Sequence, residues 1–418
     1  MNLVAPDKSE FVGCCNGFAC ITKVYNEDFA VVRGMIVVNP TRREILSLPY
    51  LHPCTEMGCK YLCHGFGFDL LTQEYKVVIV FTSRANDEFI SVVLTLGTKT
   101  WRKIVTSVAD ISPPPGSSYF PKRMVTRASG NIRTPATLCG GDLFWRMVVE
   151  NEEVNNYNNN NNKSHMLLSF DIHNEKIRFI RLPAECNLTQ TPTTTLVVEH
   201  HLLEHKGYLC IAQSEKATRN NIDQSRQDSF VCRCSFTVQL YILKDKVKQV
   251  WAKGETFGVQ VQQLGLAPAP FCCYFDAATA TPTTLPTRIM SFSDQVLLYW
   301  FDRKCLKFYN LQTERLEVVR SSCSSNWIGR FNFEAKMKRF PPERGVGGDD
   351  KSYCPYMEYQ LHTQVENIRS LKTFIPAGEI IKFDGTEEFQ RFFESNKNTL
   401  PTGWVITARE SIQHHAFY

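Results

Sequence analysis

The chain has 418 residues, of which 43% are hydrophobic, and it carries 47 Lys and Arg residues against 42 Asp and Glu residues. This length and apolar content are enough for a large core, which excludes a chain that is disordered throughout. A net charge of +5 without a Lys/Arg cluster gives no support to a nucleic-acid-binding protein, and no apolar run approaches the ~18 residues of a membrane helix.

The N-terminus and the cysteines predict a reduced, intracellular protein, cytoplasmic or nuclear. Residues 1–10 lack the long apolar segment of a signal peptide. The chain has 16 cysteines, and several of them are doubled or set among apolar residues, such as Cys14-Cys15 and Cys272-Cys273. Because free cysteine behaves as a small buried hydrophobic residue, we expect unpaired thiols in the core.

Short apolar runs bounded by turn residues follow one another from about residue 11 to about residue 320. The segments 30–32, 35–38, 76–81 and 91–96 are rich in Val and Ile, which are typical of strands. Strands do not alternate with long helices, which argues against a parallel α/β sheet. The pattern predicts an all-β fold, that is, a sandwich, a barrel or a propeller.

A strand–turn–strand unit with a large side chain in its second strand recurs along this region. Its copies lie at 37–49, 94–104, 168–183, 240–251 and 307–319. The turns contain Asn, Asp, Gly and Thr, which suit hairpins, and a unit of this size buries both faces only by stacking on its neighbours. The repeat favours an antiparallel, kelch-like β-propeller over residues 11–320, with the repeat turns on one rim.

Six motifs in a fixed order resemble those of plant F-box associated domains. They lie at 13–21, at 39–42 followed by Leu48-Pro49, at 65–69 with 75–78, at 94–102, at 143–145, and at 169–171 followed by Leu182-Pro183. The resemblance covers about residues 11–320 and departs from the family at Phe144, where His is common. It implies a non-catalytic protein-interaction module, namely the substrate-recognition domain of an SCF-type ubiquitin ligase receptor, which would bind a protein substrate through its propeller loops.

The same resemblance implies a docking segment that these residues do not show. F-box proteins usually begin with a helical F-box that binds a Skp-type adaptor of a cullin ubiquitin ligase. Only about ten residues precede the first motif, and a helical hairpin of roughly 40 residues needs more. We expect residues 1–10 to be a stub without an F-box, so that the adaptor and cullin bind only if an F-box is supplied upstream.

Three polar segments interrupt the repeat. Residues 151–163 are rich in Asn, residues 213–229 are polar, and residues 267–287 are rich in Ala, Pro and Thr. Such segments hold too little apolar surface to form packed elements, so they are predicted to be solvated loops.

The C-terminal part of the chain departs from the repeat. Residues 321–352 are predicted to be a linker, and residues 353–418 a short α/β or irregular appendage of unknown role. Within the appendage, Asp384 and Glu387 have capping-box spacing, and Phe389, Phe392 and Phe393 share one face of a short helix. This stripe is more typical of packing on the chain's own surface than of packing on a partner.

Two groups of metal-ligating residue types lack the spacing of a metal site. Cys54, Cys59, Cys63 and His64 contain no Cys-x2-Cys pair, and the adjacent Cys63 and His64 would point to opposite faces of a strand. His201 and His205 flank Glu204 without the His-Glu-x-x-His order, and the apolar residues before them favour a strand. We predict no metal and no cofactor.

The sequence shows no recognisable catalytic motif, and the substrate-binding residues stay unknown. Nucleophile elbow, phosphate-binding loop and dinucleotide fingerprint are absent. Gly65 and Gly67 are explained by strands that approach closely, and Trp101, Trp145, Trp251 and Trp300 by core packing. The alternative is a small-ligand-binding or enzymatic propeller, which acidic residues or histidines converging on the inner strands would support.

Overall fold

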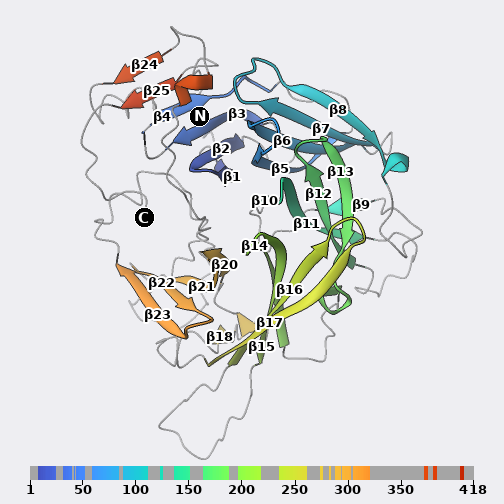
Figure 1. Cartoon of the computed structure of the whole chain (residues 1–418), viewed down its shortest axis with the longest axis vertical. Coiled ribbons are helices and arrows are strands. Elements are labelled where there is room, and N and C mark those ends of the chain that lie inside the picture. Colours follow the sequence, from blue (N-terminus) through green and yellow to red (C-terminus); the bar gives the residue numbers. More distant parts are fainter. Residues whose placement is uncertain are drawn as a thin grey trace, which may run out of the picture.

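Figure 1 shows the computed structural model of the chain as five sheets arranged around a common centre. The structure describes residues 8–24, 32–39, 42, 44–51, 59–83, 88–111, 123–125, 136–150, 163–187, 196–217, 235–260, 274–275, 282–283, 288–292, 294–302, 305–320, 371–374, 380–383 and 405–408. Within these ranges the helical segments are the short 3-10 turns η1 (Val108–Asp110), η2 (Ala184–Asn187) and η4 (Leu371–Phe374). None of the helices in the described ranges is long and apolar enough to cross a membrane.

Each sheet is built on four antiparallel strands that follow one another along the chain. The first holds β1 (Lys8–Cys15), β2 (Phe18–Val24), β3 (Val32–Asn39) and β4 (Glu44–Ser47), and the second holds β5 (Cys59–Asp69), β6 (Glu74–Ser83), β7 (Glu88–Thr95) and β8 (Arg102–Ser107). The third holds β10 (Thr137–Cys139), β11 (Asp142–Glu150), β12 (Lys163–Asp171) and β13 (Lys176–Arg181), with β9 (Arg123–Val125) also paired to β11. The fourth holds β14 (Leu196–His205), β15 (Tyr208–Ala217), β16 (Ser235–Asp245) and β17 (Val250–Gln260), and the fifth holds β20 (Arg288–Phe292), β21 (Gln295–Asp302), β22 (Cys305–Asn310) and β23 (Arg315–Arg320).

This arrangement confirms the predicted antiparallel β-propeller, with five four-stranded blades among the described residues. Every copy of the repeated unit is the hairpin of a blade's last two strands: β3–β4, β7–β8, β12–β13, β16–β17 and β22–β23. The repeat was visible in the sequence because each of these hairpins is local. The pair β18 (Tyr274–Phe275) and β19 (Pro282–Thr283) lies outside the five blades.

Apolar clusters between neighbouring blades hold the ring together. Alternate side chains of β6 serve two of them, because Val77 and Ile79 pack against the first blade while Val78 and Val80 pack against the third. Further clusters join the third blade to the fourth and the fourth to the fifth. A sheet that is apolar on both faces explains why these strands appear in the sequence as continuous apolar runs.

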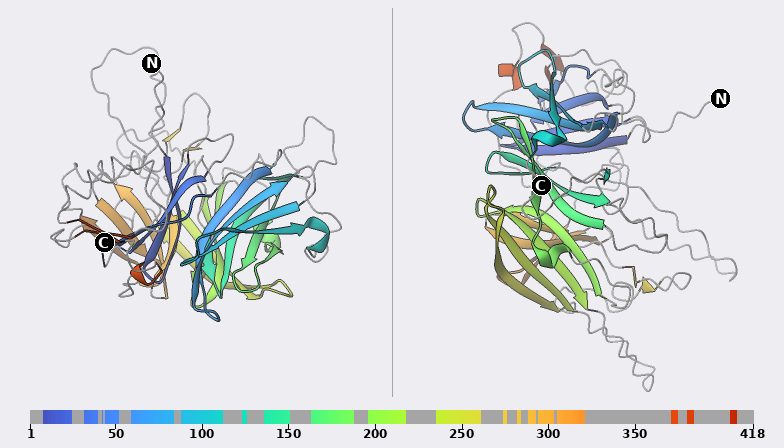
Figure 2. Two further views of the ribbon diagram at one scale, coloured as in Figure 1. Left: turned by 90° about the horizontal axis from the view of Figure 1, so that it is seen from above. Right: turned by 90° about the vertical axis from the view of Figure 1, so that its right-hand side faces the viewer.

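The two faces of the ring differ in their connections. One face, here called the turn face, carries the hairpins between first and second strands and between third and fourth strands, including the left-handed residues Gln73, Glu175, Lys206, Gln249 and Glu314. The other, here called the loop face, carries the connections between second and third strands and those between blades. The connections 151–162, 188–195 and 218–234 start and end there. Figure 2 shows the ring from two sides, each at a right angle to the view of Figure 1.

The glycines of β5 confirm close packing between the second and third blades. A Cβ on Gly67 would lie 2.4 Å from the Ile172 side chain, and one on Gly65 would lie 2.9 Å from Ala136, Leu143 and Trp145. Glycine is therefore required at both positions by space, as predicted, and not by a ligand.

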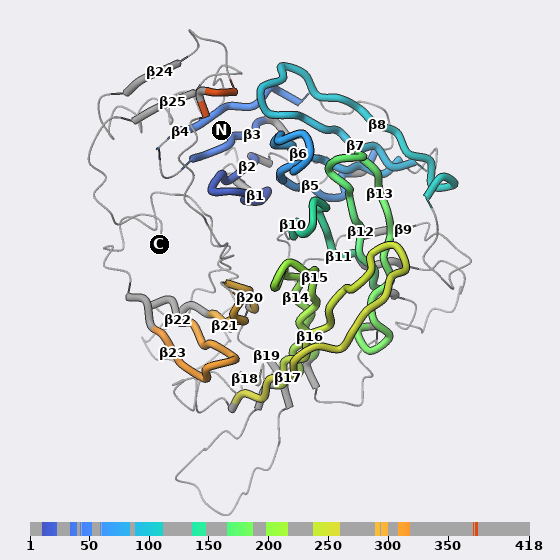
Figure 3. The backbone as a smooth tube through the Cα atoms, in the orientation of Figure 1, coloured from blue at the N-terminus to red at the C-terminus, as the bar shows by residue number. Residues whose placement is uncertain are grey.

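Segments from the C-terminal part complete the first blade and its core (Figures 1 and 3). β25 (Val405–Ala408) pairs antiparallel with β4, and β24 (Ile380–Phe383) pairs parallel with β25. In η4, Leu371 is fully buried in the cluster between the first two blades, and its N–H donates to the carboxylate of Glu44 at 2.7 Å. These segments thus belong to the first blade, although the chain between them and β23 is long.

Several sequence predictions need correction or lie outside the described residues. Residues 213–217 are not a loop, because they form the end of β15 with Gln213 and Ser214 buried. Trp145 is buried as predicted, whereas Trp101 and Trp251 are half-buried at blade junctions. Outside the described residues lie Cys54, the segment 151–162, the predicted linker 321–352, the stripe of Phe389, Phe392 and Phe393, and the side chain of Trp300.

Candidate functional site

The junction between the third and fourth blades changes from apolar to polar toward the loop face. Near the turn face, Phe144, Leu167, Leu209 and Ile211 form a buried cluster. One step further along their strands, the positions that continue this cluster hold Arg146, His165 and Gln213. The junction between the second and third blades differs, because its cluster continues through the fully buried Met147.

The pleat of the strands brings these polar side chains together. On β11, Phe144 and Arg146 face the fourth blade, while the alternate residues face the second. On β14, His200 is paired directly with Gln213 of β15, so the two side chains lie on the same face. The turn η2 borders them, and its Cys186 thiol donates to the Gln213 side-chain oxygen at 3.6 Å. We call the group of Arg146, His165, His200, Gln213, Glu215, Tyr241 and Lys253 the polar cleft.

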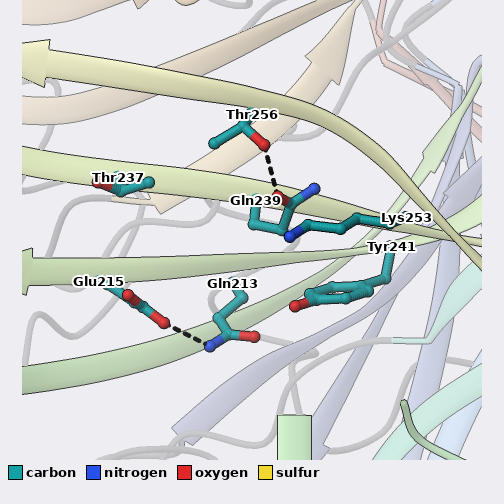
Figure 4. Close-up of a pocket in the computed structure, with 7 residues that line it drawn as sticks. All are labelled: Gln213, Glu215, Thr237, Gln239, Tyr241, Lys253 and Thr256. Atoms are coloured by element: carbon teal, nitrogen blue, oxygen red, sulfur yellow. Dashed lines mark hydrogen bonds between the residues drawn. The ribbon is translucent and has the colours of Figure 1, made fainter. Parts of the chain in front are cut away.

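The outer part of the polar cleft is a pocket of about 240 Å³ on the fourth blade, shown in Figure 4. Its lining comes from β15, β16 and β17. The lining residues are Gln213, Glu215, Thr237, Gln239, Tyr241, Lys253 and Thr256. The alternate residues of β16 face the fifth blade and include the buried Val238 and Leu240.

The side chain of Gln239 is hydrogen-bonded to the backbone of the pocket wall. The register between β16 and β17 shifts after this residue, which leaves two residues of β17 opposite Leu240. The Gln239 amide donates to the carbonyl oxygens of Leu240, Gly254 and Glu255 at 2.8, 3.0 and 3.2 Å. Its oxygen accepts a hydrogen bond from the Thr256 hydroxyl, as Figure 4 shows. The amide therefore satisfies the carbonyls of the bulge and is not available to a ligand.

The groups left for a ligand are hydrogen-bonding and charged groups. Burial, together with the nearby Glu185 and Glu215 carboxylates, raises the pKa of Tyr241 to about 12, so its hydroxyl stays protonated at neutral pH. Lys253 is exposed, and Glu215 accepts a hydrogen bond from Gln213 at 2.8 Å. The Tyr241 hydroxyl, the Lys253 ammonium and the Glu215 carboxylate can therefore bind polar and charged groups of a ligand.

Arg146 forms the inner end of the polar cleft. Its guanidinium donates to the His200 carbonyl oxygen and approaches His165 Nδ1, both at 3.3 Å. Burial and, next to it, the positive Arg146 lower the pKa of His200 to about 3, so this imidazole is neutral at physiological pH. The Nε atom of Arg146 and the Nε2 atom of His200 are buried without a hydrogen-bond partner.

The inner strands carry histidines, the feature expected of an enzymatic propeller, but their carboxylates do not converge. On β5, Asp69 accepts hydrogen bonds from the Leu71 and Thr72 N–H groups, and on β14 Glu204 accepts one from Gly207, so both close turns. Glu199 is the remaining carboxylate of β14 and lies 3.7 Å from His201. In the described part of these two strands, no two carboxylates face each other as a catalytic acid–base pair requires.

The structure separates the residues examined as metal ligands. Cys63 packs in the cluster between the second and third blades, whereas His64 bonds the Tyr61 hydroxyl and lies 3.3 Å from the Phe11 carbonyl oxygen. His201 and His205 lie four residues apart on a strand, a separation of about 13 Å that one metal ion cannot span. His205 instead bonds the Ser291 hydroxyl at 3.0 Å. Within the described ranges, no group of three or more His, Cys, Asp or Glu residues could hold a metal ion.

The sequence comparison gives the family of the N-terminal part. Residues 3–117 match the family described as F-box associated beta propeller domain. The chain is also 25% identical over 239 residues to a putative F-box protein of Arabidopsis thaliana, a match that covers 57% of this chain and 43% of the relative. The match thus spans less than half of the relative's length. The two findings confirm the resemblance that the motifs indicated.

Solved structures of other proteins are similar to this chain at low identity. An alpha-L-arabinanase of Penicillium chrysogenum is 8% identical, with 76% of this chain and 81% of that chain covered and a TM-score of 0.36. A beta-fructofuranosidase of Bombyx mori is 9% identical, with 77% and 63% covered and a TM-score of 0.34. A sialidase of Trypanosoma rangeli is 10% identical, with 76% and 48% covered and a TM-score of 0.35.

Proposed function

We propose that this chain, which belongs to the F-box associated beta propeller family through its N-terminal part, is the non-catalytic substrate-recognition module of an SCF-type ubiquitin ligase receptor. In this proposal a protein substrate binds at the loop face, over the polar cleft. The observation that carries the proposal is that the polar cleft opens where the connections 151–162, 188–195 and 218–234 begin and end. Loops on a rigid scaffold are the usual site of recognition.

The chemistry of the polar cleft supports binding rather than turnover. It offers a phenol, an ammonium, a guanidinium and a carboxylate, and Gln239 fixes the wall on which the first two of these stand. Polar groups fixed on strands give orientation and specificity to a bound partner. A glycosidase-like activity would need two converging carboxylates, and among the described lining residues Glu215 is the carboxylate of the pocket.

Docking to the ligase is assigned to an F-box outside the propeller. A Skp-type adaptor and cullin would join the chain where an F-box stands upstream, and the blades would position the substrate. We expect a purified Skp-type adaptor to bind the chain when an F-box is fused before Met1, and the 418-residue chain alone to show no saturable binding. Saturable binding by the 418-residue chain would contradict this division of labour.

A photo-crosslinking experiment tests substrate binding at the loop face. The chain, with an F-box supplied upstream, is expressed in Arabidopsis cells with a photo-crosslinking amino acid at Thr237, which is exposed at the pocket. The matched control carries it at Val247, an exposed residue of a hairpin on the turn face. The expected result is a protein that is crosslinked from position 237 only and whose half-life lengthens when cullin ligases are inhibited.

Two results would contradict the proposal. One is crosslinking from both positions alike, since that would place recognition away from the polar cleft. The other is a partner whose half-life does not respond to cullin inhibition, which would leave a binding module without a ligase role. Turnover of a small substrate that is lost in Glu215→Gln would favour the enzymatic alternative.

A further inference from the structure

At the junction between the second and third blades, two cationic side chains have carboxylate partners. Lys76 lies between the second and third blades, and its ammonium is 3.4 Å from Asp69, 3.1 Å from Glu175 and 2.9 Å from the Ile172 carbonyl oxygen. At the same junction Arg102 makes a bidentate ion pair with Glu175, with hydrogen bonds of 2.9 and 2.6 Å, although half of the Arg102 side chain is exposed. These pairs follow the rule that a cation removed from water is compensated by an anion.

Arg146 does not follow this rule. It is half-buried between the third and fourth blades, and its partners in the structure are the His200 carbonyl oxygen and the Nδ1 atom of His165, both at the long distance of 3.3 Å. A guanidinium has five N–H donors and stays charged in proteins. Two of these are used here, and the Nε donor is buried without a partner. Burying a guanidinium without an anionic partner lowers the stability of the protein, and an anion that binds to it would offset this cost.

The neighbouring acidic groups are held elsewhere. Glu199 precedes His200 on β14, so its side chain points to the opposite face of the sheet, where it lies 3.7 Å from His201. Glu215 accepts the hydrogen bond from Gln213. Among the described residues, no carboxylate lies within ion-pair distance of Arg146.

Among the described residues, the inner edge of the third blade is paired only in part. β10 pairs with residues 142–144 of β11, and β9 pairs with residues 148–150 on the same edge. Between them, the described residues place no strand beside 145–147. The side chain of Arg146 itself points from the sheet toward the fourth blade and is half-buried, so part of it stays accessible to a partner.

We propose that the inner end of the polar cleft, formed by Arg146 with His165 and His200, binds a carboxylate of a protein partner, that is, an Asp or Glu side chain. This inference rests on the proposed function and names the chemistry of the substrate segment that function would recognise. A guanidinium can donate two parallel hydrogen bonds to a carboxylate, and His200 can donate a third because it is neutral and its Nε2 atom has no partner.

Nuclear magnetic resonance of the full chain with labelled histidine side chains tests this assignment. The probes are the peptides Ac-Gly-Glu-Gly-NH2 and Ac-Gly-Gln-Gly-NH2, which differ in one charge, and inorganic phosphate. We expect saturable shifts of the His200 and His165 signals with the Glu peptide and none with the Gln peptide. In Arg146→Gln the affinity for the Glu peptide should fall at least about tenfold, because a charge-assisted hydrogen bond is lost.

Two further variants keep the test decisive. Arg102→Gln removes a guanidinium already paired with Glu175, so it should leave the affinity for the Glu peptide unchanged. Arg146→Lys keeps the charge without the fork and should bind with intermediate affinity, which covers the case in which Arg146→Gln does not fold. Shifts with phosphate alone, equal shifts with both peptides, or no shift would each overturn the assignment. Because the peptides are tested in vitro, failure here leaves the crosslinking test of ligase function intact, and the reverse also holds.

Discussion

At the scale of single residues, Gly65 sets how closely the second and third blades approach. A Cβ there would lie 2.9 Å from a methyl group of Ala136, from Leu143 and from the ring of Trp145. We expect Gly65→Ala to lower the free energy of unfolding by about 1–3 kcal/mol, the usual cost of overpacking. Gly258→Ala is the matched control, because a Cβ on this glycine of β17 meets no atom within 4 Å. Urea unfolding measures both, and equal stability of the two variants would contradict the close approach.

His200 makes the stability of the protein depend on pH. Burial, followed by the charge of Arg146, lowers the pKa of His200 to about 3 from its ordinary 6.5. Between these values the unfolded chain binds a proton that the folded chain refuses, so stability falls as pH falls below 6.5, by up to about 1.4 kcal/mol per pH unit. We expect His200→Gln to lose less stability than the natural chain between pH 7.5 and pH 5. Urea unfolding at the two pH values measures this, and identical losses would contradict a neutral His200.

The polar cleft was not predicted from the sequence, and its residues explain why. Arg146 and Gln213 each follow an apolar residue, Phe144 and Ile211, by two positions along a strand. This pattern shows that a polar residue occupies a core-facing position, but it does not show which residues of the neighbouring blade lie opposite that position. The partner of Arg146 is His200, 54 residues away on another blade. The sequence signal is the break in apolar alternation, while the cleft itself depends on contacts between blades.

At the scale of elements, two tryptophans join neighbouring blades in the same way. Trp101, just before β8, donates its indole N–H to the Pro49 carbonyl oxygen at 2.9 Å, and Trp251 in β17 donates to the Arg181 carbonyl oxygen at 2.8 Å. Both tryptophans lie at the start of the outermost strand of a blade, and both acceptors lie at the end of the preceding blade: one is Pro49 of Leu48-Pro49, and the other directly precedes Leu182-Pro183. The repeated Leu-Pro and Trp motifs are therefore the two halves of a junction between blades.

The hydrogen bond of Trp101 can be removed while an aromatic side chain is kept at this position. We expect Trp101→Phe to lower the free energy of unfolding by about 1 kcal/mol, the net value of one hydrogen bond, and Trp101→Ala to cost more because Trp101 also packs against the cluster of the first two blades. Trp251→Phe should add to Trp101→Phe, since the two bonds share no residue. Thermal and urea unfolding of the single and double variants measure this. A Trp101→Ala protein with unchanged stability but lost partner binding would make Trp101 a surface contact instead.

The elements that could be predicted are those whose pairing is local. The hairpins of the repeat join strands separated by a few residues, and their turn residues and apolar alternation are visible together. The end of β15 was assigned to a loop because its residues 213–217 are mainly polar, although Gln213 and Ser214 are buried by neighbouring blades. β25 pairs with β4, more than 350 residues earlier, and no local pattern reveals such a partner.

At the scale of the whole molecule, the ring combines apolar junctions with a polar one, and its first blade is completed by the end of the chain. The junction of the first two blades contains Leu371 and is bordered by Phe374, whose ring lies 5.9 Å from that of Tyr75 and 6.2 Å from that of Phe18. The carboxylate of Glu44, which is 2% exposed, accepts the Leu371 N–H. The C-terminal segment thus replaces water at a buried acid and fills the core of a junction made by the N-terminal strands. Folding of the first blade should therefore depend on residues far along the chain.

Leu371→Ala tests this dependence. Because Leu371 is fully buried, we expect the substitution to lower the free energy of unfolding by about 2–5 kcal/mol and to speed proteolysis of the chain after β23. Leu70→Ala is the matched control, since Leu70 is 65% exposed in a hairpin turn and should change stability by less than about 0.5 kcal/mol. Urea unfolding and timed proteolysis with mass spectrometry measure both effects. Equal stability of the two variants would show that the first blade folds without the C-terminal segment. Faster proteolysis with unchanged stability would show that η4 lies on the blade but adds nothing to its core.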